Sequence, residues 1–237
     1  MSKPFKFKHF TVSQDRSAMK VGTDGVLLGA WTTLDKNPES ILDIGAGTGL
    51  IALMLAQRST TETIDAIEIE EAAFEQCVQN FEVSPWGDRL FCYHAGLDEF
   101  VDEWEDTYDL IVSNPPFYAE EVSSGDPSRD TARQNQSLPF EELLKGVSKL
   151  LSKNGVFSTI IPFKEEKRFI ALAEKSEMHP LRITHVKGSP NSGVKRSLLE
   201  FGFSKTNLET DELTIEIERH VYTPQYIALT KDFYLKM

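Results

Sequence analysis

Short apolar runs alternate with longer amphipathic stretches along the chain from about residue 40 onward. The apolar runs are rich in Ile, Val, Leu and Phe, as is typical of buried strands, and they cover residues 41–44, 63–68, 90–93, 109–113 and 156–161. The stretches between them carry apolar residues three and four positions apart, which indicates helices, at 50–58, 70–81 and 140–151. This alternation predicts βαβ units with right-handed crossovers.

The pattern changes after the fifth predicted strand. A helical stretch at 164–175 is followed by two strand-like runs, 181–187 and 197–203, which are separated by the turn-forming cluster Gly-Ser-Pro-Asn-Ser-Gly at 188–193. Two strands joined by such a loop predict an antiparallel hairpin. We therefore expect an α/β, Rossmann-like fold: a seven-stranded, mostly parallel sheet with helices on both faces and an antiparallel C-terminal hairpin.

Composition adds limits to this picture. With 237 residues and 40% hydrophobic content, the chain can bury a substantial core, and we expect one domain over residues 1–237. No apolar run is long enough to span a membrane and the N-terminus lacks a signal peptide, so we expect a cytoplasmic protein. The cysteines, Cys77 and Cys92, form no CxxC pair, and the histidines show no ligand-like spacing. We expect reduced thiols and no metal.

Charge is unevenly distributed along the chain. The net charge of −12 argues against a general nucleic-acid coat, because proteins that bind by neutralising phosphates usually have a basic surface. Residues 1–20, however, carry Lys3, Lys6, Lys8, Arg16 and Lys20 against a single acid. A basic segment on an acidic body is compatible with an RNA substrate.

A glycine-rich turn after the first predicted strand is the sharpest local feature. The sequence runs from Asp43 through Gly45, Gly47 and Gly49 into a helix, and Glu68 closes the next strand. Glycines let backbone amides approach a ligand closely, and an acid about 20 residues on is suited to a ribose diol. The spacing is GxGxG rather than the dinucleotide GxGxxG. Together with Asp43, which is suited to orienting the cationic methionine moiety, it favours S-adenosylmethionine over NAD.

A second motif follows the fourth predicted strand, as Asn114-Pro115-Pro116-Phe117. Ligands bind at the carboxyl ends of strands in open α/β sheets, so this loop should adjoin the donor. The Asn114 side-chain oxygen and the Pro115 carbonyl can accept hydrogen bonds from an exocyclic amino group, Pro116 stiffens the turn, and Phe117 offers a stacking face. An ordinary turn is the alternative for these residues in isolation.

At this point the sequence resembles a known family, the tRNA1(Val) adenine-37 N6-methyltransferases. The resemblance covers nearly the whole chain and is carried by residues 7–10, 15–16, 19–31, 43–49, 113–117 and 226–235. It implies the class I methyltransferase fold, S-adenosylmethionine as the donor with S-adenosylhomocysteine as the product, and a tRNA substrate methylated in its anticodon loop. It also implies that an N-terminal extension, residues 1–35, contributes to the donor and RNA sites.

The same resemblance implies that Lys20, Thr23 and Asp24 pack over the donor pocket. From the residues alone, Thr23 and Asp24 before an apolar stretch indicate a helix N-cap. One position departs from the family, whose members usually carry an acid after the third strand to meet the adenine amine of the donor. Leu97 aligns there and Asp98 is the neighbouring acid, so this contact stays unassigned.

Several basic residues are candidates for binding RNA. They are Lys6, Lys8, Arg129, Arg133, Lys195 and Arg196. The alternation of Phe and Lys in residues 5–8 indicates either an RNA-binding arm or an ordinary edge strand with one apolar face. A solvated loop is the alternative for each of the other charges. The target adenine of the family lies in a loop, so extruding it costs little.

Two further functions remain open. A glutamine N5-methyltransferase acting on a release factor would present the same two amide hydrogens to Asn114, but such enzymes generally carry a helical domain before the catalytic one, for which the 40 residues before the first strand leave no room. The second open function is that of a non-catalytic module that binds the donor or RNA. The intact Asn-Pro-Pro-Phe motif argues against this function. A monomer is the default oligomeric state.

Overall fold

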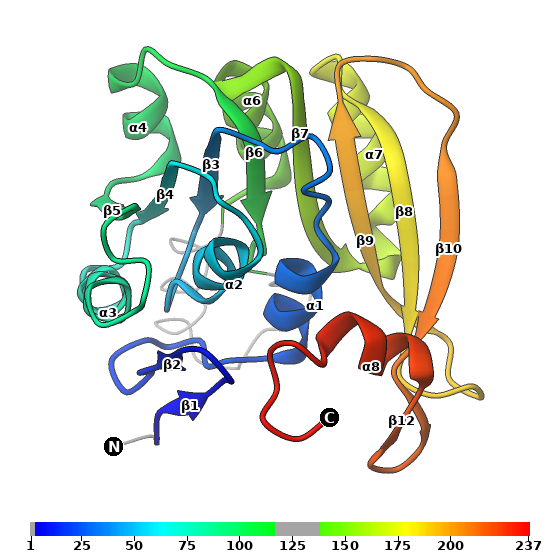
Figure 1. The fold of residues 1–237 in the computed structure, drawn as a ribbon. Coiled ribbons are helices and arrows are strands. Elements are labelled where there is room, and N and C mark those ends of the chain that lie inside the picture. The colour runs from blue at the N-terminus through cyan, green and yellow to red at the C-terminus, as the bar shows by residue number, and fades with distance from the viewer. Residues whose placement is uncertain (1–2, 117–137) are drawn as a thin grey trace, which may run out of the picture.

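The computed structural model describes residues 3–116 and 138–237, and its centre is an eight-stranded sheet with the order β10-β8-β9-β7-β6-β3-β4-β5 (Figure 1). The strands are β3 (Ser40–Ile44), β4 (Thr63–Glu68), β5 (Leu90–His94), β6 (Tyr108–Ser113), β7 (Leu151–Pro162), β8 (His179–Lys187), β9 (Val194–Gly202) and β10 (Glu209–Thr214). β9 runs antiparallel to both of its neighbours, and all other pairs are parallel. The expected Rossmann-like fold with an antiparallel hairpin, β8–β9, is confirmed.

An eighth strand extends the seven that the sequence predicts. β10 pairs in parallel with β8, where Lys187 Nζ lies 2.8 Å from Glu212 Oε2. Only Leu213 of this acidic strand is buried. A strand without an apolar run carries no periodic signal, which is why the pattern did not predict it.

Helices cover both faces of the sheet (Figure 1). One face is covered by α1 (Thr23–Trp31), α2 (Leu50–Arg58) and α3 (Glu71–Glu82), and the other by α4 (Leu97–Glu103), α6 (Phe140–Leu150) and α7 (Glu166–Lys175), which follows the short 3₁₀ helix η1 (Phe163–Glu165). Each face has its own apolar cluster, and neighbouring strand residues alternate between them: Ile41 belongs to the first and Leu42 to the second. Among the described helices, none is long and apolar enough to cross a membrane.

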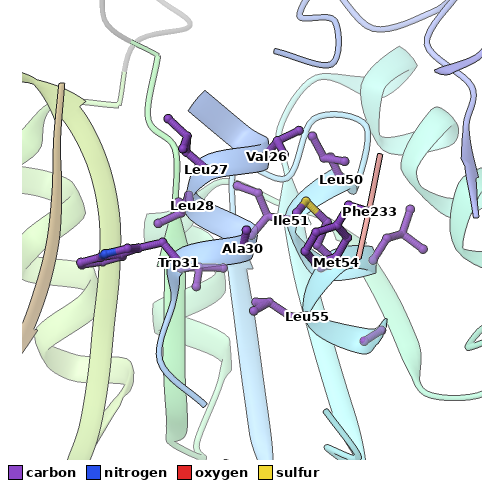
Figure 2. Close-up of a cluster of buried hydrophobic side chains, with 14 of the residues drawn as sticks. Val26, Leu27, Leu28, Ala30, Trp31, Leu50, Ile51, Met54, Leu55 and Phe233 are labelled. Carbon is purple, nitrogen blue, oxygen red and sulfur yellow. The ribbon is translucent and has the colours of Figure 1, made fainter. Parts of the chain in front are cut away.

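α1 and α2 pack closely against each other in the first cluster. In Figure 2, Val26 and Ala30 of α1 lie on the side of α2, near Ile51 and Met54, whereas Trp31 points the other way; Phe233 from the C-terminal segment belongs to the same cluster. Gly29 makes the close approach possible, because a Cβ built on it would lie 2.8 Å from Met54 Sδ and 3.0 Å from Met54 Cβ. On its other side α1 contacts β8, where Trp31 Nε1 donates to Thr184 Oγ1 at 2.9 Å.

The first residues of α1 do not cap it in the way the sequence indicates. Gly22 is the N-cap residue, with no side-chain hydrogen bond to the helix, and Thr23 is already helical. The N-cap interpretation of Thr23 and Asp24 is therefore wrong. Asp24 pairs instead with Arg196, whose Nε lies 2.8 Å from Asp24 Oδ2.

The two ends of the described chain pack together (Figure 1). They form β1 (Phe5–Lys6), β2 (Thr11–Val12), β11 (Glu216–Glu218), β12 (Val221–Tyr222) and α8 (Pro224–Thr230). Phe7 forms a bridge with Tyr234, and the Lys8 backbone N–H donates to Phe233 O at 2.8 Å. Phe7 and Phe10 are buried, so the edge-strand interpretation of these aromatic residues holds and they are not available for stacking on RNA.

Replacing Gly29 by alanine should destabilise the fold. Overpacking against Met54 costs about 1–3 kcal/mol and should outweigh the helix propensity gained, about 1 kcal/mol. The measurement is the midpoint of urea unfolding, which should fall. Gly193→Ala is the matched control, because nothing lies within 4 Å of a Cβ at that position. A midpoint for G29A equal to that of the wild type would show that the α1–α2 contact is not tight.

Candidate functional site

A cavity of about 300 Å³ opens at the carboxyl ends of β3, β4, β5 and β6. This is where open α/β sheets bind ligands. Six of the residues predicted from the sequence line it together: Gly45, Gly47, Glu68, Asn114, Pro115 and Pro116. A second hollow, of about 500 Å³, lies at the amino ends of β3 and β4, between residues 34–39 and 57–62. None of the predicted residues lines it.

The glycine turn between β3 and α2 requires glycine for two different reasons. Gly45, Gly47 and Gly49 all have positive φ, at 71°, 58° and 76°, a region that other residues enter at a cost. Nothing lies within 4 Å of a Cβ built on Gly45 or Gly47, so these two face open space. A Cβ on Gly49 would lie 2.5 Å from Phe81 Cε1. The first two glycines thus leave room for a ligand, and the third lets the turn pack on α3.

Glu68 holds this turn in place. Its Oε2 accepts from the Gly47 backbone N–H at 2.8 Å, and its Oε1 accepts from the Glu70 N–H at 2.9 Å. The carboxylate therefore bridges the two loops that follow β3 and β4, at the wall of the cavity. Both oxygens keep lone pairs that a ligand hydroxyl can use.

Asp43 lies beneath the turn and is fully buried. Its Oδ2 accepts from the Ala52 N–H of α2 at 3.1 Å, whereas Oδ1 has no hydrogen-bond partner among the residues that the structure describes. Burial raises the pKa of Asp43 to about 7; the bond from Ala52 opposes this shift and the negative charge of Glu68 adds to it. The residue is not part of the cavity lining; its bond from Ala52 joins β3 to α2 beneath the glycine turn.

The loop after β6 forms the wall opposite Glu68. Ser113 Oγ donates to Ile44 O at 2.9 Å and joins the ends of β6 and β3. Asn114 is half-buried in the lining, and within the described chain its side chain makes no hydrogen bond. Its amide is thus available to a ligand. Phe117 lies outside the described residues.

A segment of the N-terminal region covers part of the cavity, but it is not the one expected. Ser17, Ala18 and Met19 line the cavity, whereas Lys20, Thr23 and Asp24 do not. Lys20 turns back instead, and its Nζ donates to Ser17 O at 2.7 Å.

Two buried amides of α3 anchor this N-terminal segment. Asn80 exchanges hydrogen bonds with the backbone of Ser13 and also donates to Thr48 O at 2.8 Å. Gln76 accepts from the Arg16 N–H at 3.1 Å. Asn80 thereby joins the cover of the cavity to the glycine turn in one rigid arrangement.

Sequence reasoning missed Ile69, Ala95 and Gly96 in the lining, whereas Leu97 and Asp98, the two residues it left open, both line the cavity. Ile69 is 62% exposed although it is apolar, as expected for a side chain that packs on a ligand. Leu97 is buried against Gly146 of α6, whereas Asp98 is exposed in the first turn of α4. Of the two residues left open by the sequence, Asp98 has the polar group and the position to face a ligand.

Four of the six RNA-binding candidates lie within the described residues. Lys8 donates from Nζ to Lys231 O at 2.6 Å, and Lys6 is exposed in β1. Lys195 and Arg196 begin β9 beside the carboxyl end of β7. Arg129 and Arg133 lie outside the described residues.

Comparison with known proteins agrees with this geometry. The family model "Methyltransferase small domain" matches residues 22–160. A solved structure, a predicted O-methyltransferase from Agrobacterium tumefaciens, superposes with a TM-score of 0.70 at 19% identity, covering 89% of this chain and 96% of that one. The fold and the cavity at the glycine turn define a class I methyltransferase.

Two curated relatives narrow the class. Proteins named tRNA1(Val) (adenine(37)-N6)-methyltransferase from Flavobacterium johnsoniae and Flavobacterium psychrophilum are 63% and 64% identical to this chain, and each comparison covers 98% of this chain and 100% of the relative. The chain belongs to the tRNA1(Val) (adenine(37)-N6)-methyltransferase family.

The raised pKa of Asp43 predicts a pH-dependent loss of stability. The side chain has its ordinary pKa of 3.8 when unfolded and a pKa of about 7 when folded. Between these values the unfolded carboxyl is ionised while the folded one holds its proton, so stability falls as pH rises through this window and is constant above it. The loss should amount to a few kcal/mol, at about 1.4 kcal/mol per pKa unit.

Asp43→Asn is the reference for this measurement, because its side-chain oxygen can still accept from Ala52. The free energy of unfolding of the wild type, measured relative to D43N by urea titration at a series of pH values, should decline with pH across the window. Parallel curves for the two proteins would contradict the assigned pKa.

Proposed function

We propose that this protein transfers the methyl group of S-adenosylmethionine to N6 of adenine 37 in the anticodon loop of tRNA1(Val), in the cytoplasm and as a single domain. The observation that carries the proposal is the one cavity shared by the glycine turn, Glu68 and the Asn114-Pro115-Pro116 edge. The names of the full-length relatives support the tRNA substrate.

The residues present fit the methyl donor. Gly45 and Gly47 leave open space where backbone amides can approach it, and Glu68 has lone pairs for a ribose diol. Asp98 is suited to accept from the adenine amine, beside the exposed face of Ile69. Oδ1 of Asp43, which has no partner among the described residues, lies beneath the turn, and a cationic ligand nearby would favour the ionised form of this carboxyl. The donor supplies an activated methyl group on a sulfonium.

The acceptor amine meets Asn114 and Pro115. Two hydrogen bonds, to the Asn114 side-chain oxygen and the Pro115 carbonyl, localise the nitrogen lone pair that is otherwise spread into the purine ring. Pro116 restricts the loop and Phe117 supplies the stacking face for the base. No strong base is required, because the proton can leave after the methyl group has moved, and positioning supplies most of the acceleration.

Lys20 and Asp24 contribute by holding the cover of the cavity rather than by lining it, and Thr23 begins α1 next to them. The bond from Lys20 to Ser17 O tightens the segment that lies over the donor, and the Asp24–Arg196 pair fixes the start of α1 to β9. In this proposal they are positioning residues. Lys6, Lys8, Arg129, Arg133, Lys195 and Arg196 remain the candidates for contact with RNA phosphates.

The test of the function uses labelled S-adenosylmethionine and unmodified total tRNA, followed by nuclease digestion and mass analysis of the nucleosides. N6-methyladenosine beside a valine anticodon is the expected product. Label in added release factor but not in RNA would replace the substrate with protein glutamine. Donor binding without transfer to RNA, DNA or protein would indicate a non-catalytic module.

Asn114→Ala should lower kcat on the order of 100-fold while leaving the Kd for the donor nearly unchanged, since one preorganised polar contact to the reacting amine is lost. Donor binding is measured by calorimetry and turnover by transfer of label. Asn154→Ala is the matched control, because Asn154 is exposed near the amino end of β7, whereas the cavity lies at the carboxyl ends of the strands. Loss of donor affinity with turnover preserved would assign Asn114 to the donor instead.

A further inference from the structure

Phe163 is an aromatic side chain on the surface at the carboxyl end of β7, and it is 40% exposed. A single exposed apolar side chain is common in proteins and means little alone. Three independent features set this one apart: its position in the sheet, the way its ring is held, and the charges beside it.

The position is next to the acceptor loop. β6 and β7 are parallel neighbours in which Ser113 pairs with Thr159, so Pro162 lies about 10 Å beyond the level of Ser113, at roughly 3.3 Å per residue. Phe163 thus stands on the same edge as Asn114, one strand over. The separation is larger than a base held with its amine at Asn114 can span, so Phe163 is placed for a neighbouring base.

The ring is held by a chain of contacts from β8 and β9. The His185 ring packs edge-on against Phe163, with centroids 5.2 Å apart and an interplanar angle of 82°. His185 Nε2 lies 2.8 Å from Glu166 Oε2, and the same oxygen accepts from the hydroxyl of Ser197, which is fully buried. An exposed ring fixed in this way loses little freedom when a ligand stacks on it.

A basic side chain lies beside the ring. The register pairs Pro162 with Arg196, so the next positions outward, Phe163 and Lys195, are neighbours, whereas Arg196 points to the other face and pairs with Asp24 of α1. Lys195 is exposed and makes no ion pair with any residue that the structure describes. Glu165, the nearest acid along the chain, lies 3.8 Å from Lys164 Nζ and 3.7 Å from Arg168 Nη1. On a chain of net charge −12, cations beside an exposed aromatic ring match a nucleotide, with its π face and its phosphate.

We infer that Phe163 is a stacking platform for the base of a nucleotide next to the methylated adenine, and that Lys195 contacts a phosphate of the same strand. Unpaired loop bases are recognised in this way, by stacking on aromatic side chains beside positive charge. This inference rests on the proposed function, since it concerns the RNA that the protein methylates.

The test measures binding of a labelled anticodon stem-loop by fluorescence anisotropy, with methyl transfer measured in parallel. Phe163→Ala should raise the Kd for the stem-loop about 5- to 100-fold, the usual effect of removing a stacking aromatic, and leave the Kd for the donor unchanged. Phe163→Tyr should restore binding because it keeps the ring, and Phe163→Leu should not. Phe91→Ala is the matched control: Phe91 is 45% exposed on β5, an edge strand that is separated from β7 by β6, β3 and β4.

Stem-loops that lack a single base identify which base stacks on Phe163. Removing the base on one side of the target adenine should weaken binding to the wild type but have no further effect in F163A. Equal effects of F163A and F91A, or rescue by leucine, would overturn the platform. If F163A and both missing bases gave additive losses, Phe163 would not be the partner of a neighbouring base. The two failures can be told apart. If the wild-type protein methylates no RNA, the proposed function is overturned; if it methylates RNA but F163A binds the stem-loop as the wild type does, only the stacking platform is overturned.

Discussion

The hydrogen bonds that the Glu68 carboxylate accepts from the backbone amides of Gly47 and Glu70 are the interaction on which the rest of the site depends. They join the loops after β3 and β4 and so fix a turn whose three glycines all have positive φ. The same turn directs the N-terminus of α2 onto Asp43 and packs Gly49 on α3. α3 also carries Asn80, which bonds to Ser13 in the segment before the cavity cover and to Thr48 in the turn. One helix thus holds the cover in place relative to the turn. Hydrogen bonds therefore connect the cavity, the ends of β3 and β4, and the N-terminal segment to one another.

The sheet was largely predictable because its central strands are buried on both faces. Such strands have continuous apolar runs, and the strand predicted at 63–68 coincides with β4, while the helix predicted at 50–58 coincides with α2. The sequence pattern did not predict β10. This strand is stabilised by pairing with β8 and by the ion pair between Lys187 and Glu212, and neither contact produces a local pattern of apolar residues. α4 and α8 are only seven residues each, too short for a clear helical period.

The candidate site was predictable where backbone geometry demands a residue type, and less so elsewhere. Positive φ requires glycine at the turn, so Gly45 and Gly47 could be recognised. Ser17 to Met19 could not, because their place over the cavity is set by Asn80 and Gln76, about 60 residues along the chain. The choice between Leu97 and Asp98 was open in sequence because an alignment does not show which side of a helical turn faces inward. Both residues line the cavity, but Leu97 is buried against Gly146 and has no polar group, whereas Asp98 is exposed.

The pairing of the two described ends has a consequence for folding. Lys8 Nζ donates to Lys231 O across 223 positions of the sequence, so this contact closes a very long loop. The N-terminal segment also has nearer partners: Phe10 packs on Trp86, with ring centroids 5.9 Å apart, and Ser13 bonds to Asn80. The cover of the cavity can therefore dock on α3 before the C-terminal segment is in place. The contacts of greatest sequence separation carry the largest entropy of loop closure, and we expect them to form late in folding.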